Sequence, residues 1–172
     1  KETGAFHIRR GSITDTMRKS ELVAAFEENQ LLTVETCKIV NSSAEFLNRE
    51  LIEKYFKSKG IEINRENEKF LLESAGITYL DKRNRRVRCT FGGLVVFCDS
   101  NNICIPNNAI RIINIINEYF PRSIMINGNL LDMIDKTEKE MYTLLPSGYP
   151  VFAVMEAVKN SVMYREYSII DK

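Results

Sequence analysis

The sequence predicts a mixed α/β (α+β) fold, and three observations lead to that prediction. Apolar residues make up 44% and charged residues 27% of the 172 residues, which is the balance of an ordinary globular protein. Several segments carry apolar residues at helical spacing, and short β-branched runs bounded by turn residues lie between them. A chain of this length has room for one domain or two small ones.

The N-terminal part is expected to hold a strand and a helix. Residues 6–9 alternate between apolar and polar side chains and stop at Gly11, which indicates a short strand entering a turn. A helix is expected over 20–29. Residues 31–40 are short, β-branched and partly alternating, so helix and strand both remain open for them.

Two helices are expected next. Apolar residues in 48–59 fall at i, i+1, i+4 and i+5, and Gly60 is placed to end that helix in the left-handed conformation. A shorter helix is expected over 66–75, with Phe70 and the two leucines after it facing inward and Gly76 as its stop.

A basic hairpin follows these helices. Residues 77–80 and 87–89 are predicted strands, and the segment 81–86 between them is a turn rich in cations. Two short helices followed by a basic-tipped hairpin are the outline of a winged-helix-like unit, which we assign to residues 41–98. In that architecture the wing contacts phosphates and a helix can enter the major groove.

A short buried helix is expected after the hairpin. Thr90 is placed to cap it, and it should extend through Phe97. Gly92 and Gly93 lower helix propensity, so close packing against a neighbouring element is the better reason for them.

The C-terminal part alternates between strands and helices. Residues 109–116 are β-branched and favour a strand, with a buried helix as the alternative, and 124–126 are a second short strand. A helix is expected over 129–145, the segment 146–150 breaks the chain, and a last helix is expected over 151–164.

The isoleucines of the predicted strand allow two interpretations. Isoleucine is usually buried, so we expect all of them in the core. The alternative is a dimerisation module in which they form a partly exposed interface, and light scattering separates the two. The isoleucines concerned are Ile112, Ile113, Ile115 and Ile116.

Positive charge is concentrated in the middle of the chain. The formal net charge is −1 for residues 1–48, +4 for 49–88 and −2 for 89–172. A concentrated basic patch attracts polyanions even when the whole chain is near neutral, so DNA is the expected partner. A solvated hairpin tip is the alternative interpretation. The candidate phosphate contacts are Lys82, Arg83, Arg85, Arg86 and Arg88.

Several classes of protein are disfavoured. No apolar run approaches the roughly 18 residues of a membrane span, and the N-terminus has no apolar core typical of a signal peptide. We therefore expect a cytoplasmic chain with reduced thiols, with disulfides as the alternative. The four cysteines form no CxxC pair and His7 is the only histidine, which disfavours structural zinc. A Walker loop is also missing, so a helicase motor is not expected.

The last predicted helix carries two residues with chemical potential. Glu156 and Asn160 are at i and i+4 and so share one helical face. A carboxylate there can activate a water, and an amide oxygen one turn later can ligate magnesium held by phosphates. The spacing alone is common on solvated helices.

The surrounding residues resemble a known family. The segment from Tyr149-Pro150 through Glu156-Ala157 and Asn160 to Arg165-Glu166-Tyr167-Ser168 is similar to the N-box of the GHKL-type ATP-binding domain in Schlafen AlbA-like, RecG-related putative transcriptional regulators. Other stretches are similar to the same family and follow its order: Ile8–Ser12, Thr90–Phe97 and Ile126–Leu130.

The resemblance implies roles for individual residues. Glu156 would be the water-activating base, Asn160 the magnesium ligand, and Arg165 and Ser168 would lie near the nucleotide. The chain departs from the family pattern with Tyr164 in place of histidine, with glutamate in place of aspartate two positions later, and with methionine before Glu156.

The resemblance also implies a domain order and a function. Residues 1–40 would end an AlbA-like domain, 99–148 would form an α/β segment, and 149–172 would begin an incomplete GHKL-type domain. The chain would then be the middle of a longer DNA-binding, ATP- and magnesium-dependent transcriptional regulator, in which an ATPase activity stays open. We expect this chain alone to bind ATP weakly or not at all. The alternatives are an ATPase associated with a helicase-like protein and a non-catalytic dimerisation module.

Overall fold

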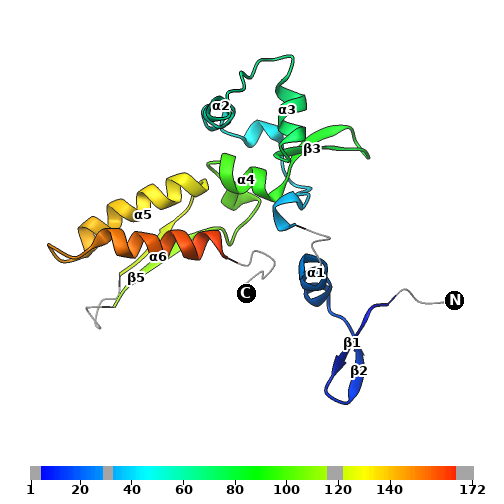
Figure 1. The fold of residues 1–172 in the computed structure, drawn as a ribbon, viewed down its shortest axis with the longest axis horizontal. Coiled ribbons are helices and arrows are strands. Elements are labelled where there is room, and N and C mark those ends of the chain that lie inside the picture. Colours follow the sequence, from blue (N-terminus) through cyan, green and yellow to red (C-terminus); the bar gives the residue numbers. More distant parts are fainter. Residues whose placement is uncertain (1–4, 29–32, 116–121, 166–172) are drawn as a thin grey trace.

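The computed structural model describes residues 5–28, 33–115 and 122–165. Within these ranges it shows six α-helices and three separate two-stranded antiparallel sheets (Figure 1). The α+β class expected from the sequence is therefore confirmed. None of the helices in these ranges has the length and apolarity needed to cross a bilayer.

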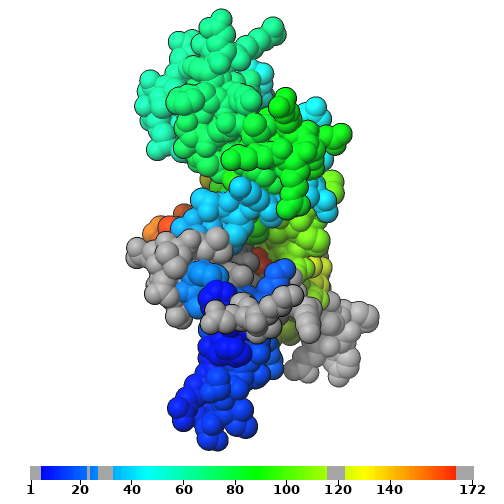
Figure 2. All heavy atoms as spheres, turned by 90° about the vertical axis from the view of Figure 1, so that its right-hand side faces the viewer, coloured from blue at the N-terminus to red at the C-terminus, as the bar shows by residue number. Residues whose placement is uncertain are grey.

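The N-terminal hairpin projects away from the remainder of the molecule (Figures 1 and 2). Strand β1 (His7–Arg10) pairs with β2 (Ile13–Thr16) across a turn in which Gly11 has a φ of 62°. The sequence predicts only the first of these strands. Helix α1 (Lys19–Glu28) follows and begins one residue before the expected range.

The middle part contains the predicted helices and hairpin. Asn48 caps the helix that begins at Arg49, because its side-chain oxygen accepts a hydrogen bond from the amide of Leu51 at 3.3 Å. The elements in chain order are η1 (Val34–Thr36), η2 (Ala44–Phe46), α2 (Arg49–Ser58), α3 (Glu68–Ser74), β3 (Thr78–Asp81), β4 (Arg86–Cys89) and α4 (Phe91–Phe97).

A hydrophobic core joins these helices to the hairpin. Leu72 is the buried residue that α3 contributes, whereas Phe70 is 70% exposed, so the inward orientation predicted for Phe70 is wrong. The reason is geometric: Phe70 lies about 200° of helical rotation from Leu72, and a helix of 7 residues buries only one narrow stripe. The core residues are Ile52, Phe56, Leu72, Ile77 and Phe97.

Helix α4 packs closely against the start of β3, as its glycines predict. A Cβ built at Gly93 would lie 2.1 Å from the carbonyl oxygen of Ile77. Thr90 caps the helix by accepting from the amide of Gly93 at 3.0 Å, and its hydroxyl donates to the carbonyl of Gly76 at 2.6 Å. The helix and the strand therefore meet without room for a side chain between them.

The C-terminal part is a hairpin covered by two helices (Figure 1). Helix α5 lies against β5 and β6, and α6 packs along α5. The core of this part comprises Met141, Val151 and Met155 with half-buried neighbours that include Ile112. The elements are η3 (Asn101–Ile103), β5 (Ile110–Asn114), β6 (Arg122–Ile126), α5 (Leu130–Leu144) and α6 (Val151–Met163).

The isoleucines of β5 and Ile115, which follows the strand, differ in their burial. Ile112 is half-buried toward the helices, whereas Ile113 is 53% and Ile115 is 72% exposed. The expectation that all of them are core residues is therefore wrong for Ile113 and Ile115. Side chains alternate along a strand, and the helices cover only one face of this hairpin. Ile116 lies outside the described residues.

A polar junction links the middle and C-terminal parts. The Asp99 carboxylate accepts hydrogen bonds from the side-chain amides of Asn48 at 2.8 Å and Asn129 at 2.7 Å. Asn48 caps α2, and Asn129 caps α5 by accepting from the amide of Asp132 at 2.9 Å. One carboxylate therefore holds the caps of two helices from different parts of the chain. We call this arrangement the Asp99 junction.

Two buried asparagines extend the Asp99 junction. The side-chain amide of Asn101 donates to the carbonyl of Gly128 at 2.8 Å, and its oxygen accepts from the amide of Asn108 at 3.2 Å. Asn101 is 0% and Asn108 is 2% exposed. The loop before β5 is thus fixed from inside the molecule.

Candidate nucleic-acid interface

The loop between β3 and β4 is built to expose its side chains. The amide of Arg85 donates to the carbonyl of Asp81 at 2.7 Å, and Arg85 itself has a φ of 56°. The Asp81 carboxylate accepts from the amide of Arg83 at 3.0 Å, and Asn84 accepts from the amide of Arg86 at 3.1 Å. Short polar side chains stabilise such tight turns by bonding nearby amides. The loop is thereby closed by its backbone and by the side chains of Asp81 and Asn84.

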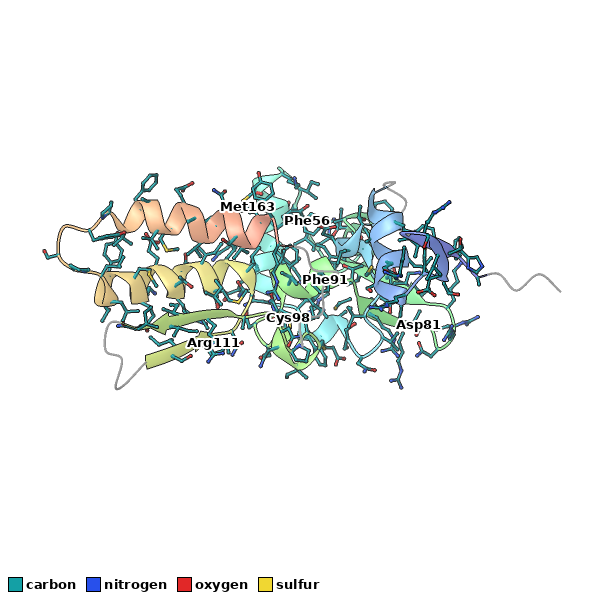
Figure 3. The ribbon with its side chains drawn as sticks, turned by 90° about the horizontal axis from the view of Figure 1, so that it is seen from below. Phe56, Asp81, Phe91, Cys98, Arg111 and Met163 are labelled. Carbon is teal, nitrogen blue, oxygen red and sulfur yellow. The ribbon has the colours of Figure 1, made fainter. Side chains whose placement is uncertain are left out.

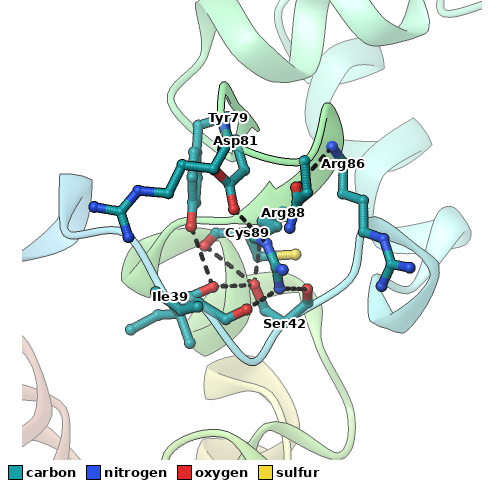
Figure 4. A network of polar contacts seen from close by, with 10 residues as sticks. Ile39, Ser42, Tyr79, Asp81, Arg86, Arg88 and Cys89 are labelled. Carbon is teal, nitrogen blue, oxygen red and sulfur yellow. Dashed lines mark hydrogen bonds and ion pairs between the residues drawn. The ribbon is translucent and has the colours of Figure 1, made fainter.

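Four cations stand on this loop, and we call them the basic tip. All four are exposed, and among the described residues none forms an ion pair with a carboxylate. Figure 4 shows Arg86 directed away from the polar network at the base of the hairpin. The members of the basic tip are Lys82, Arg83, Arg85 and Arg86.

Arg88 differs from the basic tip. Its Nε lies 3.1 Å from a carboxylate oxygen of Asp81, and only 14% of its side chain is exposed. Its Nη1 donates to the carbonyl of Val40 and lies 3.4 Å from that of Ser42 (Figure 4). Arg88 therefore ties the hairpin to the segment before η2. The sequence analysis counts Arg88 among the candidate phosphate contacts. Its position in the predicted strand 87–89, rather than in the turn, is the signal that could have distinguished it from the other four cations.

The pKa shifts of Asp81 and Tyr79 favour an ionised carboxylate and a neutral hydroxyl at the base of the hairpin. The Arg83 amide, then the Arg88 guanidinium, lower the pKa of Asp81 against the opposing effect of burial. Burial raises the pKa of Tyr79, whose hydroxyl lies 3.4 Å from the carbonyl of Ile39. Asp81 thus stays anionic and balances Arg88 inside the hairpin, leaving the basic tip as a separate group of positive charges.

Helix α3 and the segment before it carry net negative charge, in contrast to the basic tip. In a winged-helix arrangement the helix before the wing is a candidate for the major groove. Here the segment leading into α3 and the helix itself carry more carboxylates than cations, which opposes close approach to DNA. The carboxylates are Glu62, Glu66, Glu68 and Glu73, and the cations are Arg65 and Lys69.

Glu156 and Asn160 both lie on the exposed surface of α6, one turn apart, as their spacing predicts. The Glu156 carboxylate lies 3.5 Å from the Lys159 ammonium, and its side chain is 48% exposed. No group of three or more metal-ligating side chains gathers within the described ranges. The roles of Glu156 and Asn160 toward magnesium and a nucleotide therefore stay a prediction.

Arg165 is anchored elsewhere. Its Nη2 donates to the carbonyl of Asn107 at 3.1 Å, in the loop before β5. Arg165 and Arg111 line the same cavity, and Arg111 is a residue that the sequence does not single out. Nothing in the local pattern around Arg111 marks it, because its role depends on contacts with distant residues. Ser168 lies outside the described residues.

Comparison of the chain with protein-family models, with curated proteins and with solved structures gives no match. The family resemblance of the N-box segment therefore stays a prediction.

Proposed function

We propose that this chain binds double-stranded DNA through the basic tip. The observation that carries the proposal is the separation of roles among the hairpin cations. Arg88 is enclosed by Asp81 and backbone carbonyls, whereas the four cations of the basic tip are exposed and without carboxylate partners in the described part of the chain. Cations in this state can neutralise phosphates without first breaking an ion pair.

The charges around the basic tip favour contacts to the phosphate backbone. The acidic segment beside α3 opposes insertion of that helix into the major groove, where bases are distinguished. Contacts to phosphates position a protein on DNA but carry no sequence information. We therefore propose binding with little sequence preference by this chain alone, within a winged-helix-like unit.

Fluorescence anisotropy with a duplex of about 20 base pairs across a salt series tests this proposal. Four phosphate contacts predict a slope of log K against log salt of about −3.6, or roughly 150-fold weaker binding between about 50 and 200 mM salt. Arg86→Ala should reduce that slope by about one unit. A single-stranded RNA of the same length serves as the second ligand.

Lys54→Ala is the matched control, because Lys54 is an exposed cation of α2 outside the hairpin. It should leave the slope unchanged. An equal reduction of the salt slope in Arg86→Ala and Lys54→Ala would contradict the proposal that the basic tip contacts DNA. Tighter binding of RNA than of the duplex would replace DNA by RNA as the partner.

Self-association is a second candidate function, and a specific observation favours it. The outer face of the β5–β6 hairpin exposes Ile113 at 53%, Ile115 at 72% and Met125 at 55%. These apolar side chains share the face with Arg111 and Ser123, which pair across the strands with Met125 and Ile113, and exposed apolar side chains gathered on one face can mark an interface. Light scattering on the wild type and Ile113→Lys tests it: a dimer that the substitution converts to monomer supports the interface, and a wild-type monomer at all concentrations contradicts it.

The ATP- and magnesium-dependent regulation of transcription rests on the family resemblance alone. We propose it only for a longer protein that supplies further nucleotide-binding segments. Calorimetry with ATP and magnesium on this chain should show weak binding or none. Micromolar affinity would contradict the expectation that this chain alone binds ATP weakly or not at all.

A further inference from the structure

A pocket of about 390 Å³, open to solvent, lies in the middle part of the chain. Its walls come from α2, from α3 and the turn before it, from η2 and from both strands of the β3–β4 hairpin. Figure 3 shows Asp81, at the end of β3, on the opposite side of the molecule from α5 and α6. The volume of the pocket is in the range of small-molecule sites.

The floor of the pocket is apolar. Ile52 of α2 and Leu72 of α3 are 3% and 7% exposed and belong to the hydrophobic core that joins the helices to the hairpin. Val87 of β4 and Thr78 of β3 line the pocket from one face of the hairpin. Side chains that are packed into a core keep their positions when a ligand binds, so little conformational entropy is lost. Such a floor favours a ligand with an apolar body.

The rim of the pocket carries an excess of positive charge, although the segment around α3 is acidic as a whole. Arg65, Glu68 and Lys69 are at i, i+3 and i+4, so the pocket-lining residues of this segment comprise two cations and one carboxylate. Both cations are exposed, and neither forms an ion pair with a described carboxylate. Arg49 also lines the pocket, but its Nε is bonded to the Glu53 carboxylate at 2.9 Å. Arg65 and Lys69 are therefore the cations available to an anion.

Thr78 supplies a hydrogen-bonding group that the fold leaves unused. It is 3% exposed, and its hydroxyl oxygen has no hydrogen-bond partner among the described residues. A buried hydroxyl without a partner is costly, and such groups are uncommon in folded proteins. Turning the Thr78 side chain about χ1 to another staggered rotamer offers the hydroxyl to a ligand in the pocket. A polar group on the ligand would then satisfy it.

We propose that this pocket binds a small organic carboxylate with an apolar body that carries a hydroxyl or carbonyl group. The body packs on the apolar floor, the carboxylate pairs with Arg65 or Lys69, and the polar group bonds to Thr78. A singly charged carboxylate suits this rim better than a phosphate dianion, because Glu68 lies among the cations. The site shares no residue with the basic tip, so it goes beyond DNA binding and does not rest on it.

Titration of the full chain, labelled with ¹⁵N, at low salt tests the proposal. The probes are p-hydroxyphenylpropionate, phenylpropionate, which lacks the hydroxyl, and tyramine, which has an ammonium in place of the carboxylate. The hydroxylated carboxylate should shift the amide signals of Ile52, Leu72 and Thr78 with a Kd of about 1 mM or lower. Tyramine should bind about 5-fold more weakly or worse. Absence of shifts up to about 10 mM p-hydroxyphenylpropionate, or shifts that gather at the basic tip, would overturn the proposal.

Two variants assign the contacts. Thr78→Val keeps the shape of the side chain and should weaken p-hydroxyphenylpropionate by about 2- to 10-fold while changing phenylpropionate little. Urea unfolding should show it at least as stable as the wild type, because an unpaired buried hydroxyl is removed. The double variant Arg65→Gln, Lys69→Gln should weaken both carboxylates by about 5-fold and leave tyramine unweakened. Wild-type affinity of either variant for p-hydroxyphenylpropionate would overturn the proposal.

Lys54→Gln is the matched control, because Lys54 is an exposed cation of α2 that does not line the pocket. It should bind both carboxylates as the wild type does, and weakening equal to that of the double variant would overturn the proposal. Neither pocket variant should change the DNA salt slope. If the double variant flattens that slope and keeps the carboxylate affinity, its two cations are phosphate contacts and the pocket proposal is wrong. If the wild type does not bind DNA, the carboxylate titration still decides the pocket.

Discussion

Replacing Asp99 by alanine removes the one carboxylate that holds two helix caps together. Its oxygens accept from Asn48 at 2.8 Å and from Asn129 at 2.7 Å, and Asn129 is 1% exposed. In Asp99→Ala the side-chain amide of Asn129, a buried residue, loses its carboxylate acceptor. The Asn48 amide, which is nearer the surface, can instead bond to solvent.

The expected loss of stability follows from the different burial of the Asn129 and Asn48 amides. Leaving a buried donor unpaired costs about 1–3 kcal/mol, and losing a solvent-accessible hydrogen bond costs about 0.5–1.5 kcal/mol. We therefore expect Asp99→Ala to lower the free energy of unfolding by about 2–4 kcal/mol. For a domain of this size that corresponds to a fall in Tm of roughly 5–15 °C.

Urea unfolding followed by circular dichroism measures the effect. Asp135→Ala is the matched control, because Asp135 is an exposed aspartate in α5, outside the Asp99 junction. Its free energy of unfolding should stay within about 0.5 kcal/mol of the wild type. A double-mutant cycle of Asp99→Ala with Asn129→Ala should show coupling of about 1 kcal/mol or more. An Asp99→Ala variant as stable as Asp135→Ala would refute the reasoning.

Three further predictions concern packing, the hairpin base and alkaline pH. Gly93→Ala places a Cβ 2.1 Å from the Ile77 carbonyl oxygen and should destabilise the protein by about 3 kcal/mol or more in urea unfolding; wild-type stability would show that α4 can shift. Arg88→Ala should cost roughly 2 kcal/mol of stability through lost charged hydrogen bonds, with little change in the DNA salt slope of the folded protein; a reduced slope would place it among the phosphate contacts. Burial raises the pKa of Cys89 from 9.0 to about 12, so the folded chain retains a proton that the unfolded chain loses, and stability should fall as pH rises from about 9 toward 12. Urea unfolding at about pH 8 and pH 10.5 should show a smaller alkaline loss in Cys89→Ala than in the wild type, by up to about 1.4 kcal/mol per pH unit; an equal loss in both proteins would contradict the shift.

Local patterns were sufficient to predict most elements of the fold. The helix that begins after Asn48 has a cap residue and a periodic apolar face, and the one capped by Thr90 is a short, wholly apolar run that follows its cap. Orientation was harder to predict where an element is short or covered on one side. Phe70 has the helical spacing of a core residue, but α3 is too short to bury it, and Ile113 lies in a strand whose outer face no described helix covers.

The site was predicted only where its residues are neighbours in sequence. The basic tip is one continuous segment, so its charge is visible without a fold. The hydrogen bonds of the Asp99 junction connect residues up to 51 positions apart, and asparagines are also typical of turns, so their pattern in the sequence does not mark the junction. Arg111 likewise carries no local signal, because only the fold brings it to the cavity that Arg165 also lines.

The salt dependence of duplex binding by the wild type and a variant with all four cations of the basic tip replaced by alanine tests the central claim most directly. We predict a wild-type slope of about −3.6 that is almost abolished in the variant, with circular dichroism showing an unchanged fold. Equal slopes in the two proteins, or no binding by the wild type at about 50 mM salt, would contradict the claim that the basic tip is a DNA interface.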